Sequence, residues 1–469
     1  MTTLDQISDH IEAQPVFHEI STIADQIGIH VYVVGGYVRD LFLDRSVTDI
    51  DFVVEGDSIL LAEALARHFD LKRVTVYKRF GTAMIPFEDR TLEFVTARKE
   101  SYHQDSRKPV VEQADLLTDL ARRDFTINAM AIALNGARFG DLIDPYKGVA
   151  ALRQKRIETP LEPVKTFYDD PLRILRAIRF ATQLKFDIAP KTLAAIRRER
   201  QRLEIISQER ITDELLKILA AEKPSRGFLL MDETSVLSTI LPEIEQLKGV
   251  DRVGRHQHKD VFLHTLKVLD NLATLSEKTG LRFAALFHDL AKPMTKEFKP
   301  ETGWTFHGHD ELGSRLIVPV GKRLKVSNDL INYAQKLIKL HLRPIHLAEN
   351  GVTDSAIRRL IVQAGDELDD LITLCRADIT SANPKRVARH LSNFDKLVDR
   401  IREVKEKDRL AQFQSPVRGD EIMKVCNLQP GPLVGKLKKA IEEAILDGDI
   451  PNEHDAALDY LLELEKDLI

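Results

Sequence analysis

The spacing of hydrophobic residues divides the chain into a mixed N-terminal part and a helical remainder. Over residues 1–30, isoleucine and phenylalanine recur at helical intervals, which predicts helix. Runs rich in β-branched and aromatic residues then alternate with a helical pattern over 57–69. The expected strands are 31–34, 49–54, 73–77 and 91–97. From about residue 165 onward the pattern is almost entirely helical.

Glycine-containing breaks and chain length indicate several domains. At 469 residues the chain is too long for one hydrophobic core. Glycines interrupt the helical pattern around 248–258, and further turns occur at 415–420 and 428–432. We therefore expect an α+β protein with an α/β head followed by all-helical regions. The expected limits are a head at 1–150, a neck at 151–250, a histidine-rich region at 251–390 and a helical tail at 391–469.

Composition narrows the class of protein. Apolar residues make up 43% and charged residues 30%, which is typical of a soluble globular protein. The formal net charge of −5 gives no overall sign of a nucleic-acid partner, so any basic surface that binds nucleic acid must be local. The two cysteines, Cys375 and Cys426, exclude a disulfide framework and fit a reducing compartment. With no signal-peptide or membrane-helix pattern, we expect a cytoplasmic protein with no membrane partner.

Three carboxylates in strand-like segments of the head predict a metal site. Asp49 and Asp51 fall within the apolar run DIDFVV, and alternation along a strand puts them on one face. Glu93 lies in a second strand-like run, TLEFVTA. If these strands are neighbours, the carboxylates converge. Oxygen-only clusters suit Mg²⁺, and two such ions can activate a hydroxyl and stabilise a leaving pyrophosphate.

The surroundings of this pair weigh against a simpler interpretation. A bare Asp-x-Asp is more often a solvent-facing part of an edge strand. Here Gly35 and Gly36 precede it and allow the backbone to approach a phosphate, while Arg39 can neutralise one. The segment ARRDFTINAMA follows at 121–131.

These segments resemble a known superfamily. GGYVRD, DID, LEFVTAR and RRDFTINAMA are similar to the catalytic head of class II tRNA nucleotidyltransferases and bacterial poly(A) polymerases, and FYDDPLRILRAIRFATQLKF and ISQERITDELLKIL resemble their neck. The resemblance implies a polymerase β-type nucleotidyltransferase head in which Asp49 and Asp51 bind the metal ions and Glu93 is the third carboxylate. The implied nucleotide-binding residues of the head are Gly35, Gly36, Arg39, Arg122, Arg123, Asp124 and Asn128.

The neck contains candidates for reading a nucleotide base. In DDPLR, Asp170 and Arg173 are three residues apart and share a helix face. A carboxylate accepts from an exocyclic amino group and a guanidinium donates to a ring nitrogen, which suits cytosine or adenine. The segment resembles the family's EDxxR motif, with Asp169 in place of Glu. The alternatives are an N-cap at Asp170 and a salt bridge from Asp169 to Arg173.

Basic residues continue along the neck. Arg176 and Arg179 are further nucleotide-binding candidates. Residues 173–210 contain ten basic and four acidic residues, which suits either RNA phosphates or an ordinary solvated helix face.

The histidine-rich region resembles HD-domain phosphohydrolases in FLHTLKVLD, ALFHDLAK and FHGHDELGS. The implied metal ligands are His264, His288, Asp289 and Asp378. Imidazole with carboxylate suits a divalent transition metal, and the resemblance implies hydrolysis of phosphoesters. The ordinary alternative for any one of them is a buried core histidine. His309 and His341 could support a second metal ion, and this possibility stays open.

Together the resemblances imply a CCA-adding enzyme with an HD domain. The 3′-hydroxyl of tRNA attacks the α-phosphate of CTP and then of ATP, and pyrophosphate leaves. Residues 100–120 read as a long polar loop that can move when base choice changes. The alternatives are a poly(A) polymerase, an enzyme that adds only A or only CC, and an HD phosphohydrolase whose head merely binds nucleotide or RNA. The oligomeric state stays open.

Overall fold

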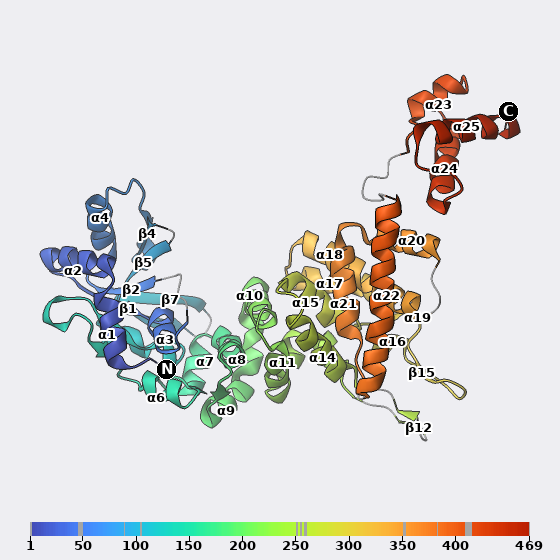
Figure 1. Cartoon of the computed structure of the whole chain (residues 1–469). Coiled ribbons are helices and arrows are strands. Elements are labelled where there is room, and N and C mark those ends of the chain that lie inside the picture. The colour runs from blue at the N-terminus through green and yellow to red at the C-terminus, as the bar shows by residue number, and fades with distance from the viewer. Residues whose placement is uncertain are drawn as a thin grey trace. The chain divides into compact units, whose positions relative to one another are not determined.

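The computed structural model describes residues 2–45, 50–88, 90–103, 106–249, 252–253, 256–257, 260–349, 353–381, 383–408 and 415–468. The chain forms two compact units, Met1–Glu245 and Gln246–Ile469, which are described separately (Figure 1). Within the described residues, no helix combines the length and the apolar character that crossing a membrane requires.

A seven-stranded mixed sheet forms the centre of unit 1, in the order β3-β4-β5-β2-β1-β8-β9. Its central pair β2–β5 is parallel and the other neighbouring strands are antiparallel. The strands are β1 (His30–Val34), β2 (Ile50–Glu55), β3 (Thr75–Tyr77), β4 (Thr82–Phe87), β5 (Arg90–Thr96), β8 (Ala131–Ala133) and β9 (Leu142–Ile143).

Short helices connect and cover these strands. They are α1 (Leu4–Glu12), α2 (Pro15–Ile27), α3 (Gly36–Phe42), α4 (Ser58–His68), η1 (Lys78–Phe80), α5 (Leu116–Ala121), η2 (Thr126–Asn128), η3 (Gly136–Arg138) and α6 (Gly148–Arg153). Local signals set their ends: α2 begins at Pro15 and ends before Gly28 in the left-handed conformation, and the Asp57 carboxylate caps α4. The strands and helices expected before residue 98 are therefore confirmed, and α3, η1 and β4 are additional elements.

Alternating side chains give the sheet two buried faces. On one face Phe52 stacks on Phe94, with ring centroids 4.7 Å apart, and Phe17 of α2 packs edge-on against Phe52. On the other face Val34 and Val53 join a cluster that α5 covers with Leu120. Asp51 belongs to this second face, since its neighbours Ile50 and Phe52 point to the first.

The long loop expected over 100–120 is wrong. Strands β6 (Arg98–His103) and β7 (Ser106–Gln113) pair as an antiparallel hairpin, and α5 follows. Polar side chains hide the strand pattern here, because a two-stranded ribbon need not bury one whole face.

The neck is helical, as expected, with two short strands. Its elements are β10 (Arg156–Ile157), α7 (Pro163–Asp169), α8 (Leu172–Leu184), β11 (Asp187–Ile188), α9 (Pro190–Glu199), η4 (Arg200–Ile205), α10 (Gln208–Leu219), α11 (Pro224–Glu233), α12 (Val236–Ile240) and α13 (Pro242–Glu245). Helix α8 is the central one, and it packs against α7, α10 and α11.

Unit 2 is predominantly helical. Its elements are β12 (Arg252–Val253), β13 (His256–Gln257), α14 (Val261–Ala273), α15 (Thr279–Phe287), α16 (Lys292–Thr295), β14 (Glu297–Lys299), β15 (Gly303–Thr305), α17 (His309–Arg323), α18 (Asn328–Leu340), α19 (Leu342–Glu349), α20 (Asp354–Ala364), η5 (Gly365–Glu367), α21 (Leu368–Asp378), α22 (Pro384–Asp408), α23 (Gly419–Val425), α24 (Pro432–Asp447) and α25 (His454–Leu468). The expected limit at 390 falls inside α22, so helix periodicity alone does not locate a boundary there.

Gly148 should be required for the packing of α6 against η2. A Cβ at this position would lie 2.5 Å from the Thr126 carbonyl oxygen, which is backbone and cannot rotate away. We expect Gly148→Ala to lower the free energy of unfolding by about 1–3 kcal/mol. Denaturant unfolding measures this. Gly435→Ala is the control, because nothing lies within 4 Å of its Cβ and Ala favours the α24 helix. Equal stability of both variants would contradict the packing argument.

Candidate active sites

The register of β2 and β5 places two predicted carboxylates side by side. Asp51 pairs directly with Glu93 across the parallel ladder. Directly paired residues point to the same side of a sheet, so both lie on the face opposite Phe52. Asp51 is exposed and Glu93 half-buried. Asp49, the other predicted ligand, lies outside the described residues.

The glycine pair forms the turn from β1 into α3. Gly35 has a φ of +70°, a left-handed conformation that glycine adopts without strain. A Cβ there would lie 3.0 Å from Nη1 of Arg123, so the missing side chain lets a guanidinium approach the turn. Arg39, one helical turn on, donates to Asp40 and from Nη1 to Oδ1 of Asn128, at 2.8 Å.

A fully buried carboxylate orients the arginine pair of RRDFTINA. Asp119 of α5 accepts from Nη2 of Arg122 at 2.6 Å and from Nη2 of Arg123 at 3.1 Å. Burial opposes its ionisation, but Arg123 and Arg122 outweigh burial and hold the pKa of Asp119 below its ordinary value. Asp119 was missed in the sequence, although its spacing of three and four residues before two arginines on a helix is a usable signal.

Asp124 joins this segment to the neck. Its Oδ2 lies 2.6 Å from Nη2 of Arg176 on α8, and its Oδ1 accepts from Nδ2 of Asn128 at 3.0 Å. Burial alone would raise the pKa of Asp124, but Arg176, the Asn128 hydrogen bond and Arg173 lower it. The carboxylate is therefore ionised near neutral pH and fixes the head against α8.

The predicted base-reading pair lies between α7 and α8. Oδ1 of Asp170 accepts from the Leu172 N–H at 3.2 Å, so the capping role weighed above is present in part. Its Oδ2 is 3.6 Å from Nη2 of Arg210 on α10. Arg173 donates through Nη2 to the Arg122 carbonyl at 2.6 Å, one of the five N–H groups of its guanidinium.

Arg179 and Arg176 surround an aromatic ring. The Arg179 guanidinium lies 4.0 Å from the ring centroid of Phe180, and those of Arg39 and Arg176 lie 5.1 and 5.4 Å away. The buried Glu214 of α10 accepts from Nε of Arg179 at 2.6 Å. Phe180 and Glu214 were also missed. In the local sequence Phe180 looks like an ordinary core residue, and Glu214 looks like an ordinary solvent-exposed residue.

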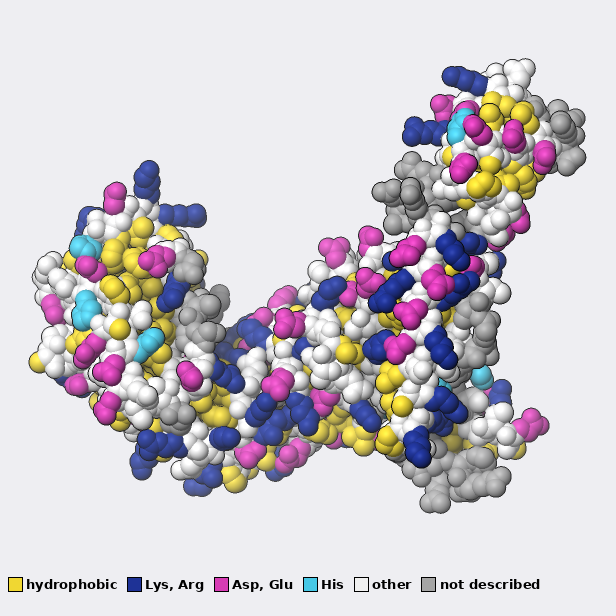
Figure 2. Space-filling model, viewed as in Figure 1, with side chains coloured by type: hydrophobic (Ala, Val, Ile, Leu, Met, Phe, Trp, Pro, Cys, Tyr) yellow, Lys and Arg dark blue, Asp and Glu magenta, His cyan; other side chains and the backbone are white. Residues whose placement is uncertain are grey.

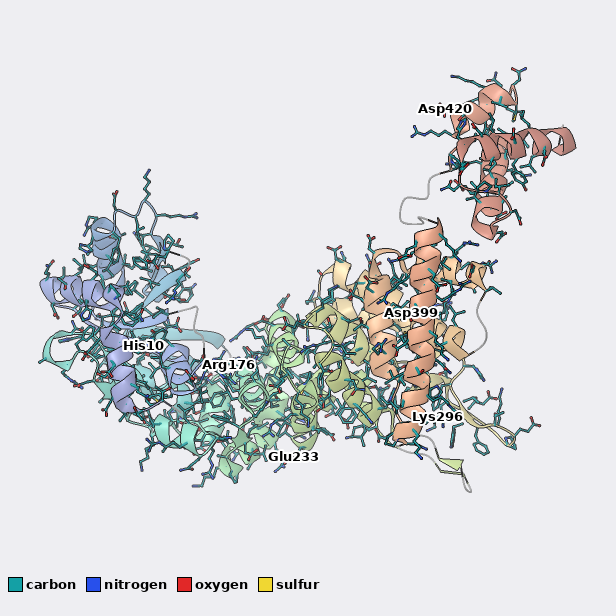
Figure 3. The ribbon with its side chains drawn as sticks, in the orientation of Figure 1. His10, Arg176, Glu233, Lys296, Asp399 and Asp420 are labelled. Atoms are coloured by element: carbon teal, nitrogen blue, oxygen red, sulfur yellow. The ribbon has the colours of Figure 1, made fainter. Side chains whose placement is uncertain are left out.

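These side chains line one cleft of about 470 Å³. Figure 3 labels Arg176, which lies where the neck helices meet the head strands. The lining residues are Gly35, Gly36, Arg39, Asp51, Arg122, Arg123, Asp124, Asn128, Asp170, Leu172, Arg173, Arg176, Phe180 and Arg210. Every described candidate of the head and neck is among them except Glu93 and Arg179.

The basic excess of the neck is largely neutralised. Lys185 pairs with Glu222, and Arg197 with Glu233, each within 2.8 Å. Arg202 instead stacks over the Tyr168 ring at 3.7 Å. The sequence count alone therefore overstates the charge that this face offers to phosphates.

Unit 2 gathers the predicted histidines and aspartates at one point. Nε2 of His264 lies 2.9 Å from Oδ1 of Asp378, and Nε2 of His288 lies 3.3 Å from Oδ2 of Asp289. His264, His288 and Asp378 form one candidate metal group, and Asp289, His309 and His341 form a second. The chain thus brings together all four predicted ligands and the two open candidates.

Each histidine presents the same nitrogen to this centre. The Nδ1 atoms of His288, His309 and His341 lie 2.6–2.7 Å from main-chain carbonyls, so they act as donors and leave Nε2 as the lone-pair atom. Among the described residues these buried Nε2 atoms have no hydrogen-bond partner, and neither has Oδ1 of Asp289. Buried, unpartnered ligand atoms around one point are what a metal site requires.

The electrostatics distinguish the two groups. Burial lowers the pKa of His288, but Asp289 and Asp378 raise it to about 10. Burial, with His288 nearby, lowers the pKa of His341 to about 4. The carboxylates of the cluster therefore strongly favour a positive charge beside them. Either a proton on His288 or a bound metal cation can supply that charge.

Three family descriptions match successive parts of the chain: the Poly A polymerase head domain at 31–158, the probable RNA- and SrmB-binding site of polymerase A at 185–248, and the HD domain at 261–383.

Relatives match this chain over most of their length. The A-adding tRNA nucleotidyltransferase of Deinococcus radiodurans is 31% identical over 434 residues, covering 90% of this chain and 93% of that protein. The CC-adding tRNA nucleotidyltransferase of Thermus thermophilus is 30% identical over 435 residues, covering 91% and 92%. The multifunctional CCA protein of Chromobacterium violaceum is 36% identical over 341 residues, covering 71% and 79%.

Solved structures agree on the fold. The CCA-adding enzyme of Bacillus stearothermophilus in complex with CTP superposes with a TM-score of 0.69 at 23% identity, covering 97% of this chain and 98% of that one. The Thermotoga maritima CCA-adding enzyme complexed with tRNA gives 0.63 at 22% identity, with 99% of each chain covered. The chain therefore belongs to the class II tRNA nucleotidyltransferase family, as an enzyme with a polymerase-type head and an HD domain.

Proposed function

We propose that this enzyme adds C, C and A to the 3′ end of tRNA from CTP and ATP, in the cytoplasm. The main support for this proposal is the cleft, because it brings together carboxylates, several arginines that can contact a triphosphate, and the Asp170–Arg173 pair. Relatives named for A addition and for CC addition are about equally similar to this chain, so the full reaction rests on the cleft.

The cleft suits the two bases that the reaction needs. Cytosine and adenine each carry an exocyclic amino group beside a ring nitrogen acceptor. Asp170 would accept from the amino group and Arg173 would donate to the ring nitrogen. Uracil and guanine present a carbonyl and an N–H at those places, which would leave both side chains unpaired. One pair can therefore accept both substrates and reject the other two nucleotides.

The remaining residues have roles that follow from their positions. Arg39, Arg122 and Arg123 would hold the triphosphate against the Gly35 turn. Asp49 and Asp51, with Glu93 beside Asp51, would hold Mg²⁺, which supplies activation of the hydroxyl and neutralises charge when bound. Phe180, between Arg39 and Arg179, would keep the guanidiniums apart and desolvated.

Incubation with tRNA lacking CCA, CTP and ATP, followed by sequencing of the added end, tests the proposal. We expect C, C and A in that order. Asp51→Asn should lower the rate of incorporation about a thousandfold, because loss of a metal ligand removes several kcal/mol of transition-state stabilisation.

Two controls make this assay decisive. Equilibrium binding of CTP to Asp51→Asn should persist, since the cationic walls are intact. Asp141→Asn, at an exposed aspartate paired with Arg138, should behave as the wild type. Uptake of ATP but never CTP, or incorporation that survives in Asp51→Asn, would refute the proposal.

Asp119 should set nucleotide affinity through the arginines it orients. Asp119→Asn leaves both guanidiniums without their buried counter-ion, so KM for CTP and ATP should rise about tenfold and the free energy of unfolding should fall by about 3–5 kcal/mol. Steady-state kinetics below the melting transition measure the first effect. Asp115→Asn is the matched control, because Asp115 caps the same helix and Asn is about as good an N-cap as Asp, so stability and KM should change little. An unchanged KM in Asp119→Asn would exclude the orienting role.

A second activity is favoured by the cluster in unit 2. We propose that it binds a divalent transition metal and hydrolyses phosphoesters. His264, His288, Asp289 and Asp378 would be ligands, and His309 and His341 with Asp289 would suit a second ion. Lys292, whose Nζ contacts Oδ2 of Asp289 and which lies over the Phe306 ring at 5.8 Å, would face the phosphate.

His288→Ala should separate the two activities. Removal of a residue that only hydrogen-bonds to a metal ligand typically lowers metal affinity by about 10–100-fold. Removal of the ligand itself should therefore lower it by more than about a hundredfold. Titration with Mn²⁺ or Ni²⁺ and hydrolysis of bis-p-nitrophenyl phosphate measure this, and CTP incorporation should be unchanged. The exposed His454→Ala is the control. Metal binding that persists in His288→Ala would show that the cluster is only a buried ionic network.

A further inference from the structure

Exposed cations and aromatic rings lie together on one edge of the head sheet. This β3 edge surface consists of Lys72, Arg73, Tyr77, Lys78, Arg79 and Phe80, all of them exposed. The Tyr77 and Phe80 side chains are 49% and 48% exposed, which is high for large rings. In Figure 2, Lys and Arg side chains project from the upper end of the head, where Figure 1 places α4 and β4.

The four cations of this surface have no ion-pair partner within the described part of the chain. The neck differs, since Lys185, Arg197 and Arg210 each face a carboxylate. A cation that is already paired must exchange its partner to bind a phosphate, whereas an unpaired one does not. The β3 edge surface therefore offers positive charge that the folded protein itself does not use.

The turn that carries the aromatics is held firmly. Gly81 has a φ of +54°, and its carbonyl accepts from the Thr96 N–H at 2.8 Å and from the Ser58 hydroxyl at 2.7 Å. The Phe80 carbonyl accepts from Nη1 of Arg98 at 3.2 Å. Rings on a fixed turn lose little freedom when a ligand binds them.

Strand register relates this surface to the catalytic carboxylates. Asp51 pairs with Glu93, Glu93 with Met84, and Met84 with Thr75, so one row crosses the sheet from β2 to β3. Tyr77 is two residues beyond Thr75 and shares its side, which is the side of Asp51. Three strand spacings separate β2 from β3, a distance of about 14 Å. A chain only a few units long can span this surface.

We propose that the β3 edge surface binds the unpaired nucleotides that precede the 3′-hydroxyl of the RNA. The proposal rests on the function proposed above, because it assumes that this hydroxyl reaches Asp51. Unpaired cations suit backbone phosphates, and exposed rings on a basic surface suit stacking with bases that are not already stacked in a duplex. Paired RNA hides its base faces, so the aromatics favour the single-stranded end over the stem.

The test uses the full-length enzyme and two RNA hairpins that differ only in an unpaired 3′ extension. Tyr77→Ala/Phe80→Ala removes the rings, and Lys78→Ser/Arg79→Ser removes two charges. Lys78→Arg/Arg79→Lys keeps the charges and should behave as the wild type. Arg138→Ser, an exposed cation in η3 between β8 and the opposite edge strand β9, is the matched control. Circular dichroism and melting temperature check that each variant is folded.

We expect the KM for the extended hairpin to rise about tenfold in the ring variant, while kcat and the KM for CTP stay within about twofold. The charge variant should reduce the slope of log binding constant against log salt by about 1.4. Unchanged RNA binding in both variants would overturn the proposal. So would an equal loss for the blunt hairpin, which would assign the surface to the stem. Equilibrium binding of both hairpins is measured as well, without nucleotide. A wild type that adds nothing to RNA would therefore refute the proposed function, while the binding measurements would still test this surface.

Discussion

The buried ion pair between Asp124 and Arg176 is the interaction on which the nucleotide cleft depends. Asp124 follows the arginine pair of the head and Arg176 belongs to α8 of the neck. The head alone supplies Asp51 and the arginines proposed to hold the triphosphate, and the neck alone supplies Asp170 and Arg173. At their junction the buried Asp124 and the half-buried Arg176 form a close ion pair that fixes the distance between these two sets. Removal of one partner would leave a buried charge unmatched, so this geometry tolerates little variation.

The charges of unit 1 fall into two classes. In the cleft, several cations have a carboxylate close by: Asp119 for Arg122 and Arg123, and Asp124 for Arg176. These pairs keep guanidiniums ordered and partly desolvated before a polyanion arrives, which lowers the cost of binding a triphosphate. On the β3 edge the cations have no such partners among the described residues. Ordered, paired cations suit a small ligand in one pose, while unpaired ones suit a long and variable strand.

Much of unit 1 could be predicted because its signals are local. Alternation in DIDFVV predicted that Asp51 lies on the face opposite Ile50 and Phe52, and the glycine pair predicted a close approach of the backbone to a phosphate, although helix α3 itself was not expected. Register is a long-range property, so only the structure shows Asp51 directly beside Glu93. Strand β4 was missed because Pro86 and its short apolar run TAMIPF resemble a connection. The hairpin at 98–113 was missed because its sequence is rich in polar residues and lacks the regular apolar alternation of a half-buried strand. Glu214 was missed because its partner Arg179 lies 35 residues away in the sequence. Asp119 was missed because its neighbours Arg122 and Arg123 could equally have been solvent-exposed residues.

The two candidate metal sites differ in ligand chemistry, and this bears on why one chain holds both. The head offers carboxylate oxygens on its two central strands, at least one of them exposed, which suits a hard ion that arrives with its nucleotide. Unit 2 offers imidazoles fixed by main-chain carbonyls in a buried centre, which suits a resident transition metal. Because the preferences differ, a Mg²⁺ concentration that supports nucleotide addition need not fill the histidine cluster, and a scarce transition metal need not disturb the head. If both proposed sites hold metal, this difference in ligand type would let them coexist in one protein without competing for the same ion.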